Sequence, residues 1–365
     1  MRERMAGAES RTTGIPAAAT AARGAHLVGS VALPSVERVF SQAGEILGKR
    51  LKRVPDGEPG GRSLWISWQY PVLRANPYLA VDASGAANPA SGFRKLALAD
   101  GVAGGDLAFG ELGYAREARA SYIDFRRARD AGRIPSGCRF QVCLPTPFAC
   151  VFPFVSTSAL GVVEPAYERA MMAELERIFA EIPHGDLALQ WDVCVEMVLW
   201  DGRSPFYRAP WQSSTEEQVT ERMERICATV PQAVELGFHL CYGDWDAKHF
   251  IEPQDMGKMV ELANALSSAV THPIAWLHFP VPVARDDDEF FRPLGRLDLD
   301  EKTEIYLGLL HLEDGVEGAR RRTDAAGKYL GRFGLATECG LGRCKTPETV
   351  LQILRLHAET CGETI

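Results

Sequence analysis

The stretch AVELGFHLC, residues 233–241, is a short apolar run of the kind that forms a buried strand. The segment before it, residues 213–231, places apolar residues at helical spacing and starts with a capping-box pattern, Ser213 three residues before Glu216. The same alternation continues towards the end of the chain. Further strands are expected at 273–282, 303–312 and 332–342, and further helices at 252–269, 316–330 and 347–359. A strand followed by a helix every ~30 to 40 residues is typical of parallel β/α winding.

The first half of the chain shows the same elements less regularly. Strand candidates lie at 24–34, 137–147 and 185–197, a helix is expected near 163–180, and residues 78–92 indicate a loop or hairpin. The chain has 365 residues, 46% of them hydrophobic, which is enough to bury one large core. We therefore predict an α/β fold, a single (β/α)₈ TIM barrel over residues 25–365, with loop insertions at the C-terminal face of its strands.

The first 24 residues differ in composition from the rest of the chain. They are rich in Ala, Thr, Gly and Arg and contain no continuous apolar segment like that of a secretory signal. We predict a disordered tail over residues 1–24; a transit peptide is the alternative, although Glu3 and Glu9 interrupt it. Elsewhere no apolar run approaches the ~20 residues that a membrane helix needs, so we expect no membrane partner.

Charge and cysteine usage narrow the class of protein. The formal net charge is −8, and no basic stripe is present that would bind a nucleic acid or an anionic membrane. We interpret the short basic stretch GKRLKR, residues 48–53, as a solvated helix end. The nine cysteines are odd in number and scattered, which favours a reducing, cytoplasmic location with thiols that are unpaired or bind metal.

A candidate metal site combines the run 233–241 with a motif near the end of the chain. His239 and Cys241 are two residues apart on a predicted strand, so their side chains project to the same side. Cys339 lies at the end of the strand predicted at 332–342, and the carboxyl ends of barrel strands face one mouth. Imidazoles and thiolates converging in threes or fours are zinc ligands, so we predict that these residues bind Zn²⁺.

Other polar and thiol side chains have less specific interpretations. Asp286, Asp287 and Asp288 lie in the irregular segment 282–296 and could bind a divalent cation through oxygen, or form an ordinary solvated loop. Cys344 could be a spare ligand or a surface thiol. Four cysteines in apolar surroundings are interpreted as inert core thiols: Cys143, Cys150, Cys194 and Cys227.

The two halves of the candidate site resemble a known family. GFHLCYGDW at 237–245 together with ATECGLGR at 336–343 resembles the catalytic C-terminal barrel of cobalamin-independent methionine synthases, within the uroporphyrinogen decarboxylase and methionine synthase-like superfamily. Three other segments match in order: HLVGSVALP at 26–34, VPDGEPGGR at 54–62 and LQWDVCVEM at 189–197. The resemblance spans roughly residues 25 to 360 and is to the short members of the family, which have a single barrel.

The resemblance implies roles for residues outside the metal motif. Ser30, in the Gly-Ser loop, would contact the amino acid thiol substrate, and Glu58 and Asp192 would hold its ammonium group. His311, near a histidine position of the family, is the predicted proton donor to the leaving group and, with Asp192, makes up the predicted catalytic residues. Each of these has an ordinary alternative, a salt bridge for the carboxylates and a buried, hydrogen-bonded ring for His311.

The fourth position of the metal site departs from the family pattern. The family carries a glutamate ligand on the strand after His-x-Cys, and this chain has His278 about there. His278 could be the fourth zinc ligand, a substrate contact, or a core histidine bonded to a backbone carbonyl. His249 is a rival for the same position. The site predicted on this basis is His239, Cys241, Cys339 and His278.

These residues predict an enzyme that transfers a methyl or other alkyl group to a thiol. A free thiol has a pKa near ~8.5, and Zn²⁺ held by two cysteinates deprotonates it, so that the thiolate can attack an alkyl carbon. The closest expected activity is that of 5-methyltetrahydropteroyltriglutamate–homocysteine methyltransferase in methionine biosynthesis, with a methylated folate as donor. The alternatives are a zinc-dependent alkyltransferase with another donor and thiol, a metal-free decarboxylase or lyase of the same superfamily, and a barrel with a structural zinc.

Overall fold

Eight parallel strands form a barrel at the centre of the molecule. The computed structural model describes residues 23–83, 92–102, 104–205, 207–210, 213–243, 248–342 and 346–362. The strands are hydrogen-bonded in the order β1-β10-β9-β8-β7-β6-β5-β2, and a parallel bridge between Ala25 and Leu51 brings the two ends of this sheet together. Their bounds are β1 (Ala25–His26), β2 (Arg53–Pro55), β5 (Arg139–Pro145), β6 (Leu187–Val193), β7 (Glu235–Leu240), β8 (Ile274–Pro280), β9 (Glu304–Leu310) and β10 (Gly334–Thr337). The predicted (β/α)₈ TIM barrel is confirmed.

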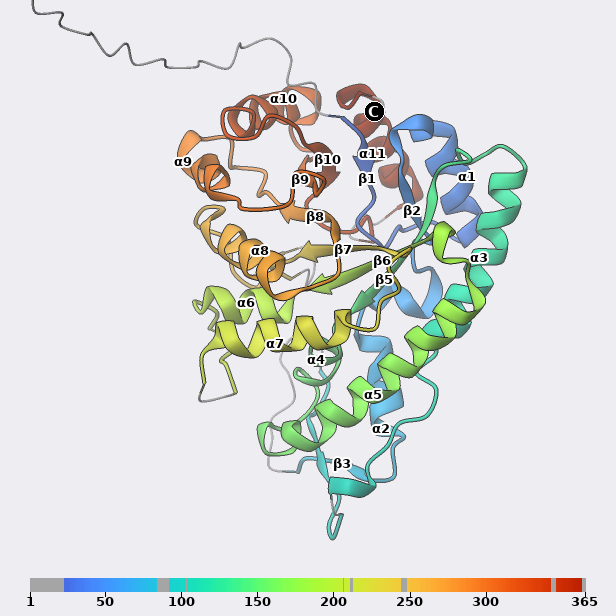
Figure 1. Cartoon of the computed structure of the whole chain (residues 1–365), viewed down its shortest axis with the longest axis vertical. Helices are drawn as coiled ribbons and strands as arrows, with labels where there is room; N and C mark the ends of the chain where they lie inside the picture. Colours follow the sequence, from blue (N-terminus) through green and yellow to red (C-terminus); the bar gives the residue numbers. More distant parts are fainter. Residues whose placement is uncertain are drawn as a thin grey trace, which may run out of the picture.

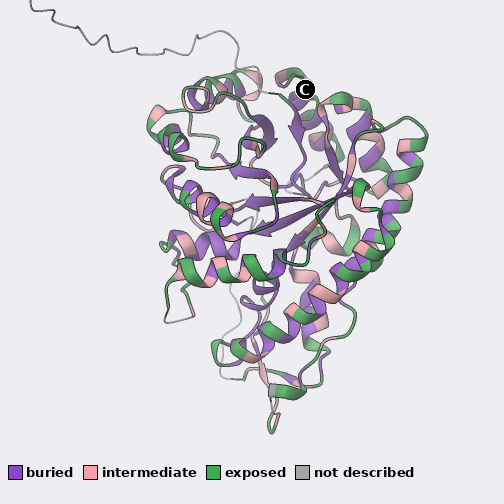
Figure 2. Cartoon of the chain, in the orientation of Figure 1, coloured by how far each residue is buried: buried purple, intermediate pink, exposed green. Residues whose placement is uncertain are grey.

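Helices surround this barrel (Figure 1). The longer ones are α1 (Val36–Leu47), α3 (Tyr114–Asp130), α5 (Thr157–Glu181), α7 (Thr215–Cys227), α8 (Gly257–Ala269), α10 (Gly315–Ala326) and α11 (Pro347–Thr360). Figure 2 shows the buried residues on the strands and on the helix sides that face them, with exposed residues on the outer sides. The apolar periodicity of the sequence therefore corresponds to one continuous core between barrel and helices.

The segment that precedes the strand at 233–241 forms a helix, but one residue later than its sequence pattern indicates. The N-cap of α7 is Ser214, whose side chain makes no capping hydrogen bond. The capping box predicted at Ser213 is wrong, because the backbone enters the helix only after Ser214. The apolar face is as expected, since α7 buries Val219, Met223, Ile226 and Cys227.

A long insertion follows β2 and begins at the carboxyl ends of the barrel strands. It contains the short helix α2 (Tyr70–Arg74) and an antiparallel hairpin of β3 (Leu79–Val81) and β4 (Leu96–Leu98). The hairpin lies at the bottom of Figure 1, next to α2 and α5. This resolves the loop or hairpin expected at 78–92 as a hairpin, of which residues 84–91 lie outside the described part of the chain.

The acidic segment after β8 is more regular than its composition suggests. It contains a short helix, α9 (Asp288–Phe291), whose N-cap Asp287 accepts a hydrogen bond from the Phe290 amide. The expectation of a wholly irregular loop is therefore wrong, because the aspartates supply a cap that starts a helix. Each carboxylate also pairs with a nearby cation: Asp286 with Arg321, Asp287 with Arg285, and Asp288 with Arg292 and Lys328. These ion pairs support the ordinary-loop alternative over a cation site.

The amino-terminal end of the barrel is closed by a buried ionic network. Arg53 has a side chain only 4% exposed and bonds Glu235 at 2.5 Å and Glu304 at 2.8 Å. Its guanidinium also lies 4.2 Å from the ring centre of Trp276. The interpretation of residues 48–53 as a solvated helix end is wrong for Arg53, which points into the barrel because strand β2 begins there.

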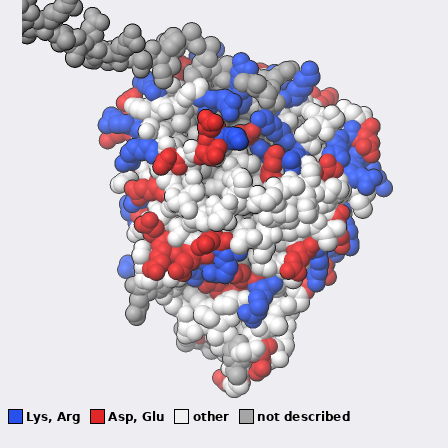
Figure 3. Space-filling model, viewed as in Figure 1, with Lys and Arg blue, Asp and Glu red and all other residues white. Residues whose placement is uncertain are grey.

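The visible surface carries charges of both signs. Figure 3 shows Lys and Arg interspersed with Asp and Glu around a broad uncharged area, without a basic stripe on this face. Within the described residues, none of the helices combines the length and the apolar character needed to cross a bilayer.

Candidate metal centre

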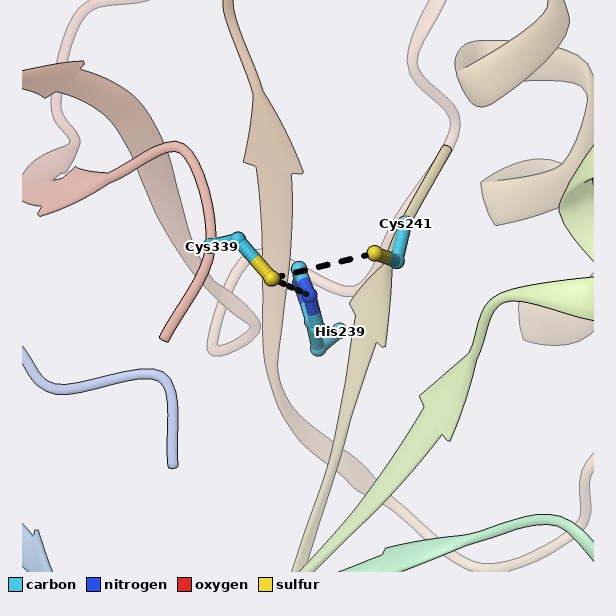
Figure 4. A group of neighbouring side chains, drawn as sticks. All are labelled: His239, Cys241 and Cys339. Atoms are coloured by element: carbon cyan, nitrogen blue, oxygen red, sulfur yellow. Dashed lines mark hydrogen bonds between the residues drawn. The ribbon is translucent and has the colours of Figure 1, made fainter. Parts of the chain in front are cut away.

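Three soft donors meet at the carboxyl ends of the barrel strands. His239 lies on β7, Cys241 directly follows that strand, and Cys339 lies just after β10 (Figure 4). Figure 4 shows both sulfurs and the imidazole turned towards one another from the two strands. The side chains of His239 and Cys241 point to the same side because side-chain direction alternates along a strand. Cys339, which follows β10, reaches them because the carboxyl ends of parallel barrel strands lie at one rim. The sequence-predicted trio is brought together as expected.

The spacing of these donors fits a tetrahedral metal ion. The sulfurs of Cys241 and Cys339 are 3.9 Å apart, and the Cys339 sulfur is 3.6 Å from Nε2 of His239. All three ligand atoms lie within 4.8 Å of one another. Zinc bonds of ~2.3 Å to sulfur and ~2.0 Å to nitrogen at tetrahedral angles would separate two sulfurs by about 3.8 Å and sulfur from nitrogen by about 3.5 Å. The two separations that involve Cys339 therefore match those around such an ion.

His278 lies behind His239 and not in the group of three. Its Nδ1 is 2.7 Å from Nδ1 of His239, and its Nε2 is 3.0 Å from the carbonyl oxygen of Thr337. The ring is fully buried, and burial lowers the pKa of His278 to about 3, so the imidazole is neutral. Both ring nitrogens are engaged, which corresponds to the third alternative, a core histidine bonded to a backbone carbonyl.

Cys241 has further partners close to its sulfur. The amide of Gly243 lies 3.3 Å from the Cys241 sulfur and donates to it. Cys194 forms a hydrogen bond with the same thiol. Val193 pairs with Leu240 across β6 and β7, so the residues that follow them, Cys194 and Cys241, lie side by side. Cys194 was interpreted as an inert core thiol, and its place beside the centre follows from strand register, which the sequence alone did not reveal.

Two carboxylates form a second group near the mouth. Asp192, at the end of β6, accepts a hydrogen bond of 2.9 Å from Gln190 and another from the Trp65 side chain. Burial raises the pKa of Asp192 to about 7. Burial and the neighbouring Asp192 raise the pKa of Glu58 well above its ordinary range. Two carboxyl groups in a poorly solvated place favour a bound cation, because a positive charge would relieve both effects.

The backbone near these carboxylates is strained. Among the described residues, the non-glycine positions with positive φ are Glu58, at 53°, and Trp65, at 49°. Such conformations cost on the order of 1 to 3 kcal/mol each and gather at functional sites. Both residues interact with Asp192. Trp65 was not identified from the sequence, because a lone tryptophan in an insertion carries no motif.

Ser30 ties the amino-terminal loop to the loop that carries Cys339. Its hydroxyl lies 3.3 Å from the Gly342 amide, which also bonds the Ser30 carbonyl at 3.1 Å. Cys143, near the two carboxylates, keeps its proton because burial, followed by Asp192 and Glu58, raises its pKa. Its neighbours Gln141 and Gln190 are polar, so the apolar surroundings predicted for this thiol are not found.

Two other histidines lie near the rim with their rings engaged. Nε2 of His311 is 2.9 Å from the Val281 carbonyl, and burial together with Arg322 lowers the pKa of His311 to about 4. A neutral ring whose proton is already donated does not support the predicted role as an acid. His249 lies between Glu252, at 2.9 Å, and Glu338, at 3.2 Å, and outside the group of three donors. Cys344 lies outside the described residues.

Comparisons with known proteins agree with this barrel. No protein-family model matches the chain, and neither does any curated protein. Two solved structures are similar over nearly their full length. A candidate vitamin-B12-independent methionine synthase from Listeria monocytogenes has a TM-score of 0.54 and 14% identity, covering 94% of this chain and 99% of that one. A B12-independent methionine synthase from Shewanella sp. W3-18-1, in complex with selenomethionine, has a TM-score of 0.56 and 12% identity, covering 93% and 97%.

This chain shares their fold. At such low identity the likeness extends to the architecture alone and not to the activity. The predicted resemblance to the methionine synthase family is thus supported at the level of the barrel, and the roles of individual residues depend on the site geometry described above.

Proposed function

We propose that this chain is a zinc-dependent transferase that moves a methyl or other alkyl group to the sulfur of a small thiol. The observation that carries the proposal is the spacing of His239, Cys241 and Cys339, which fits a tetrahedral ion at a barrel mouth. A zinc ion held there would act as a Lewis acid that keeps the sulfur of an incoming thiol deprotonated at neutral pH.

The number of donors favours a catalytic over a structural site. Catalytic zinc commonly has three protein ligands and one position for water or substrate, whereas structural zinc has four. Among the residues the structure describes, His239, Cys241 and Cys339 are the His, Cys, Asp and Glu side chains that lie close enough together. Asp244, Asp246 and Cys344, which follow these ligands in the sequence, lie outside the described residues.

The two carboxylates suit an acceptor that carries an ammonium group. Glu58 and Asp192 would bind it by charge-assisted hydrogen bonds, and its charge would lower both raised pKa values. Ser30, held against the Cys339 loop, would contact the same substrate. An amino acid thiol such as homocysteine combines the sulfur and the ammonium group, and a methylated folate is the donor that the family resemblance proposes.

Metal analysis and a transfer assay test the proposal together. Purified protein is expected to hold near-stoichiometric zinc, the Cys241→Ser, Cys339→Ser double variant to hold none, and Cys227→Ser to keep it, because that buried thiol is remote on α7. Incubation of the zinc protein with homocysteine and methylated folate should yield the S-methylated product, and a chelator should abolish it.

Other outcomes identify the alternatives. Activity in a metal-free protein would contradict the proposal and favour a decarboxylase or lyase. If the protein binds zinc but no thiol in a panel changes its melting temperature, the zinc is structural. A thiol other than homocysteine that raises the melting temperature only with zinc present would keep the reaction class and change the acceptor.

A further inference from the structure

His278 stands where the family resemblance places a metal ligand, yet its two nitrogens are bonded to other groups. Its Nδ1 lies 2.7 Å from Nδ1 of His239, and its Nε2 lies 3.0 Å from the Thr337 carbonyl oxygen. A carbonyl oxygen only accepts, so Nε2 of His278 carries a hydrogen and Nδ1 of a neutral ring presents a lone pair. His239 must then donate its Nδ1 hydrogen to that lone pair.

This order of hydrogens prepares His239 for a metal. A neutral imidazole with its hydrogen on Nδ1 has its lone pair on Nε2. Nε2 of His239 is the atom that lies 3.6 Å from the Cys339 sulfur, on the side of the three donors. The hydrogen bonds that His239 donates to His278, and His278 to Thr337, therefore select the tautomer of His239 that can bind metal and fix the plane of the His239 ring.

The same bonds also connect to the third donor. The Thr337 hydroxyl donates to the carbonyl of Cys339 at 2.7 Å, while the Thr337 carbonyl accepts from His278. His278 is on β8 and Thr337 on β10, so the contact passes over the intervening strand β9. The link thus ties the strand that carries His239 to the loop that carries Cys339.

The intervening strand has no side chain at the crossing point. Gly308 of β9 lies so near β10 that an added Cβ would be 3.0 Å from the Thr337 carbonyl oxygen and 2.7 Å from Cα of Glu338. Any larger residue would push Thr337 away from its present place. The close approach of β10 at this point is what allows a histidine two strands away to reach the carbonyl.

We propose that His278 is a positioning residue that holds His239 in its metal-binding tautomer and, through Thr337, sets its distance from Cys339. The centre then uses three protein ligands, and the position that a glutamate ligand takes in the family is left to the substrate. The inference rests on the proposed metal centre and deepens it, because it assigns His278 to support of a ligand and not to the ligand set.

Zinc affinity separates the two roles of His278. The full-length protein and three variants, His278→Gln, His278→Leu and His272→Leu, would be titrated with zinc against a chromophoric chelator. Glutamine can accept from His239 and donate to Thr337, so H278Q should stay within about threefold of wild type, whereas H278L should bind about 10- to 100-fold more weakly. His272 is a matched control, because it is a buried histidine whose ring nitrogens face the backbone carbonyls of Pro273 and Pro231, away from the centre.

X-ray absorption at the zinc edge gives the second readout. We expect two sulfurs and one imidazole from the protein in wild type and in H278Q. Two imidazoles in wild type, falling to one in H278Q, would make His278 a ligand and overturn the inference. Wild-type affinity in H278L would also overturn it, and if H278L does not fold, H278Q decides between the roles, since glutamine replaces the hydrogen bonds but is a poor zinc ligand.

The outcome is independent of the transfer reaction. A protein that binds zinc through the expected ligands, and loses affinity in H278L, but transfers no alkyl group would contradict the proposed function and leave the role of His278 standing. Full zinc affinity together with full transfer activity in H278L would contradict the role of His278 and leave the proposed function standing.

Discussion

Asp192 is a buried carboxyl group whose own environment opposes its charge. Burial raises its pKa to about 7, although Gln190 and Trp65 donate hydrogen bonds to it. A carboxyl whose pKa is higher in the folded than in the unfolded state binds more protons when folded between about pH 4 and pH 7. Such a group favours folding at the acid end of this window, and its contribution is lost as the pH rises through it.

The Asp192→Asn variant should remove this pH dependence. Between pH 5 and pH 8, wild type should lose on the order of 2 to 3 kcal/mol of unfolding free energy that the variant keeps. Denaturant titrations at the two pH values measure this difference. Asp186→Asn is the control: Arg129 lowers the pKa of Asp186, so this carboxyl is ionised in both states between pH 5 and pH 8, and its removal should leave the pH dependence at the wild-type value. Equal pH dependence in wild type and D192N would contradict the assignment.

The site residues that the sequence predicted are those whose positions follow from a local pattern. His239, Cys241 and Cys339 were found because residue type and the strand period suffice to place them on one rim. The positions of Cys194 and Trp65 depend on strand register and on the path of an insertion, which no local pattern encodes. The roles proposed for Ser30 and Glu58 came from the family resemblance and remain predictions.

At the scale of elements, the turn after β7 is built around a glycine. Gly243 has a φ of 96°, and a Cβ there would lie 2.3 Å from the Phe250 ring. Its amide donates to the Cys241 sulfur at 3.3 Å, so the turn both ends the strand and places a hydrogen-bond donor on this thiol. The Phe250 amide donates to the Tyr242 carbonyl at 2.8 Å, which holds Phe250 beside Gly243.

A Gly243→Ala substitution should therefore strain the turn and displace the amide from Cys241. We expect a loss of about 1 to 3 kcal/mol of stability together with weaker zinc binding. Thermal unfolding and chelator competition measure the two effects. Gly185→Ala is the matched control, because a Cβ at Gly185 would meet nothing within 4 Å. An unchanged zinc affinity in G243A would show that the amide does not support the ligand.

Elements were predictable where the period is clear and less so elsewhere. The helices after residue 213 follow their apolar spacing because each packs on the barrel by one face, and the strands are continuous apolar runs because both of their faces are buried. The hairpin β3–β4 and the helix α9 depend on contacts outside the barrel and on a single aspartate cap. The strands β3 and β4 have three residues each and α9 has four, so they are too short to show a periodic pattern.

At the scale of the whole molecule, the two ends of the barrel divide its tasks. The carboxyl ends of the strands carry the soft donors and the carboxylates of Glu58 and Asp192, whereas the amino ends carry the buried pairs of Arg53 with Glu235 and Glu304. Barrel enzymes in general separate catalysis from stability in this way. The amino end of this barrel buries a charged residue between two carboxylates, which explains why Arg53 was mistaken for part of a solvated segment.

This division predicts that Arg53→Met lowers stability without affecting the metal. Removal of the guanidinium leaves Glu235 and Glu304 without their central partner and removes a cation from the face of Trp276, so we expect a loss of about 3 to 5 kcal/mol. Zinc stoichiometry should stay at the wild-type value, because the network lies at the opposite end of the barrel. Arg225→Met removes an exposed pair with Glu168 and should cost at most about 1 kcal/mol. Loss of zinc in R53M at temperatures where the protein remains folded would show that the two ends are coupled.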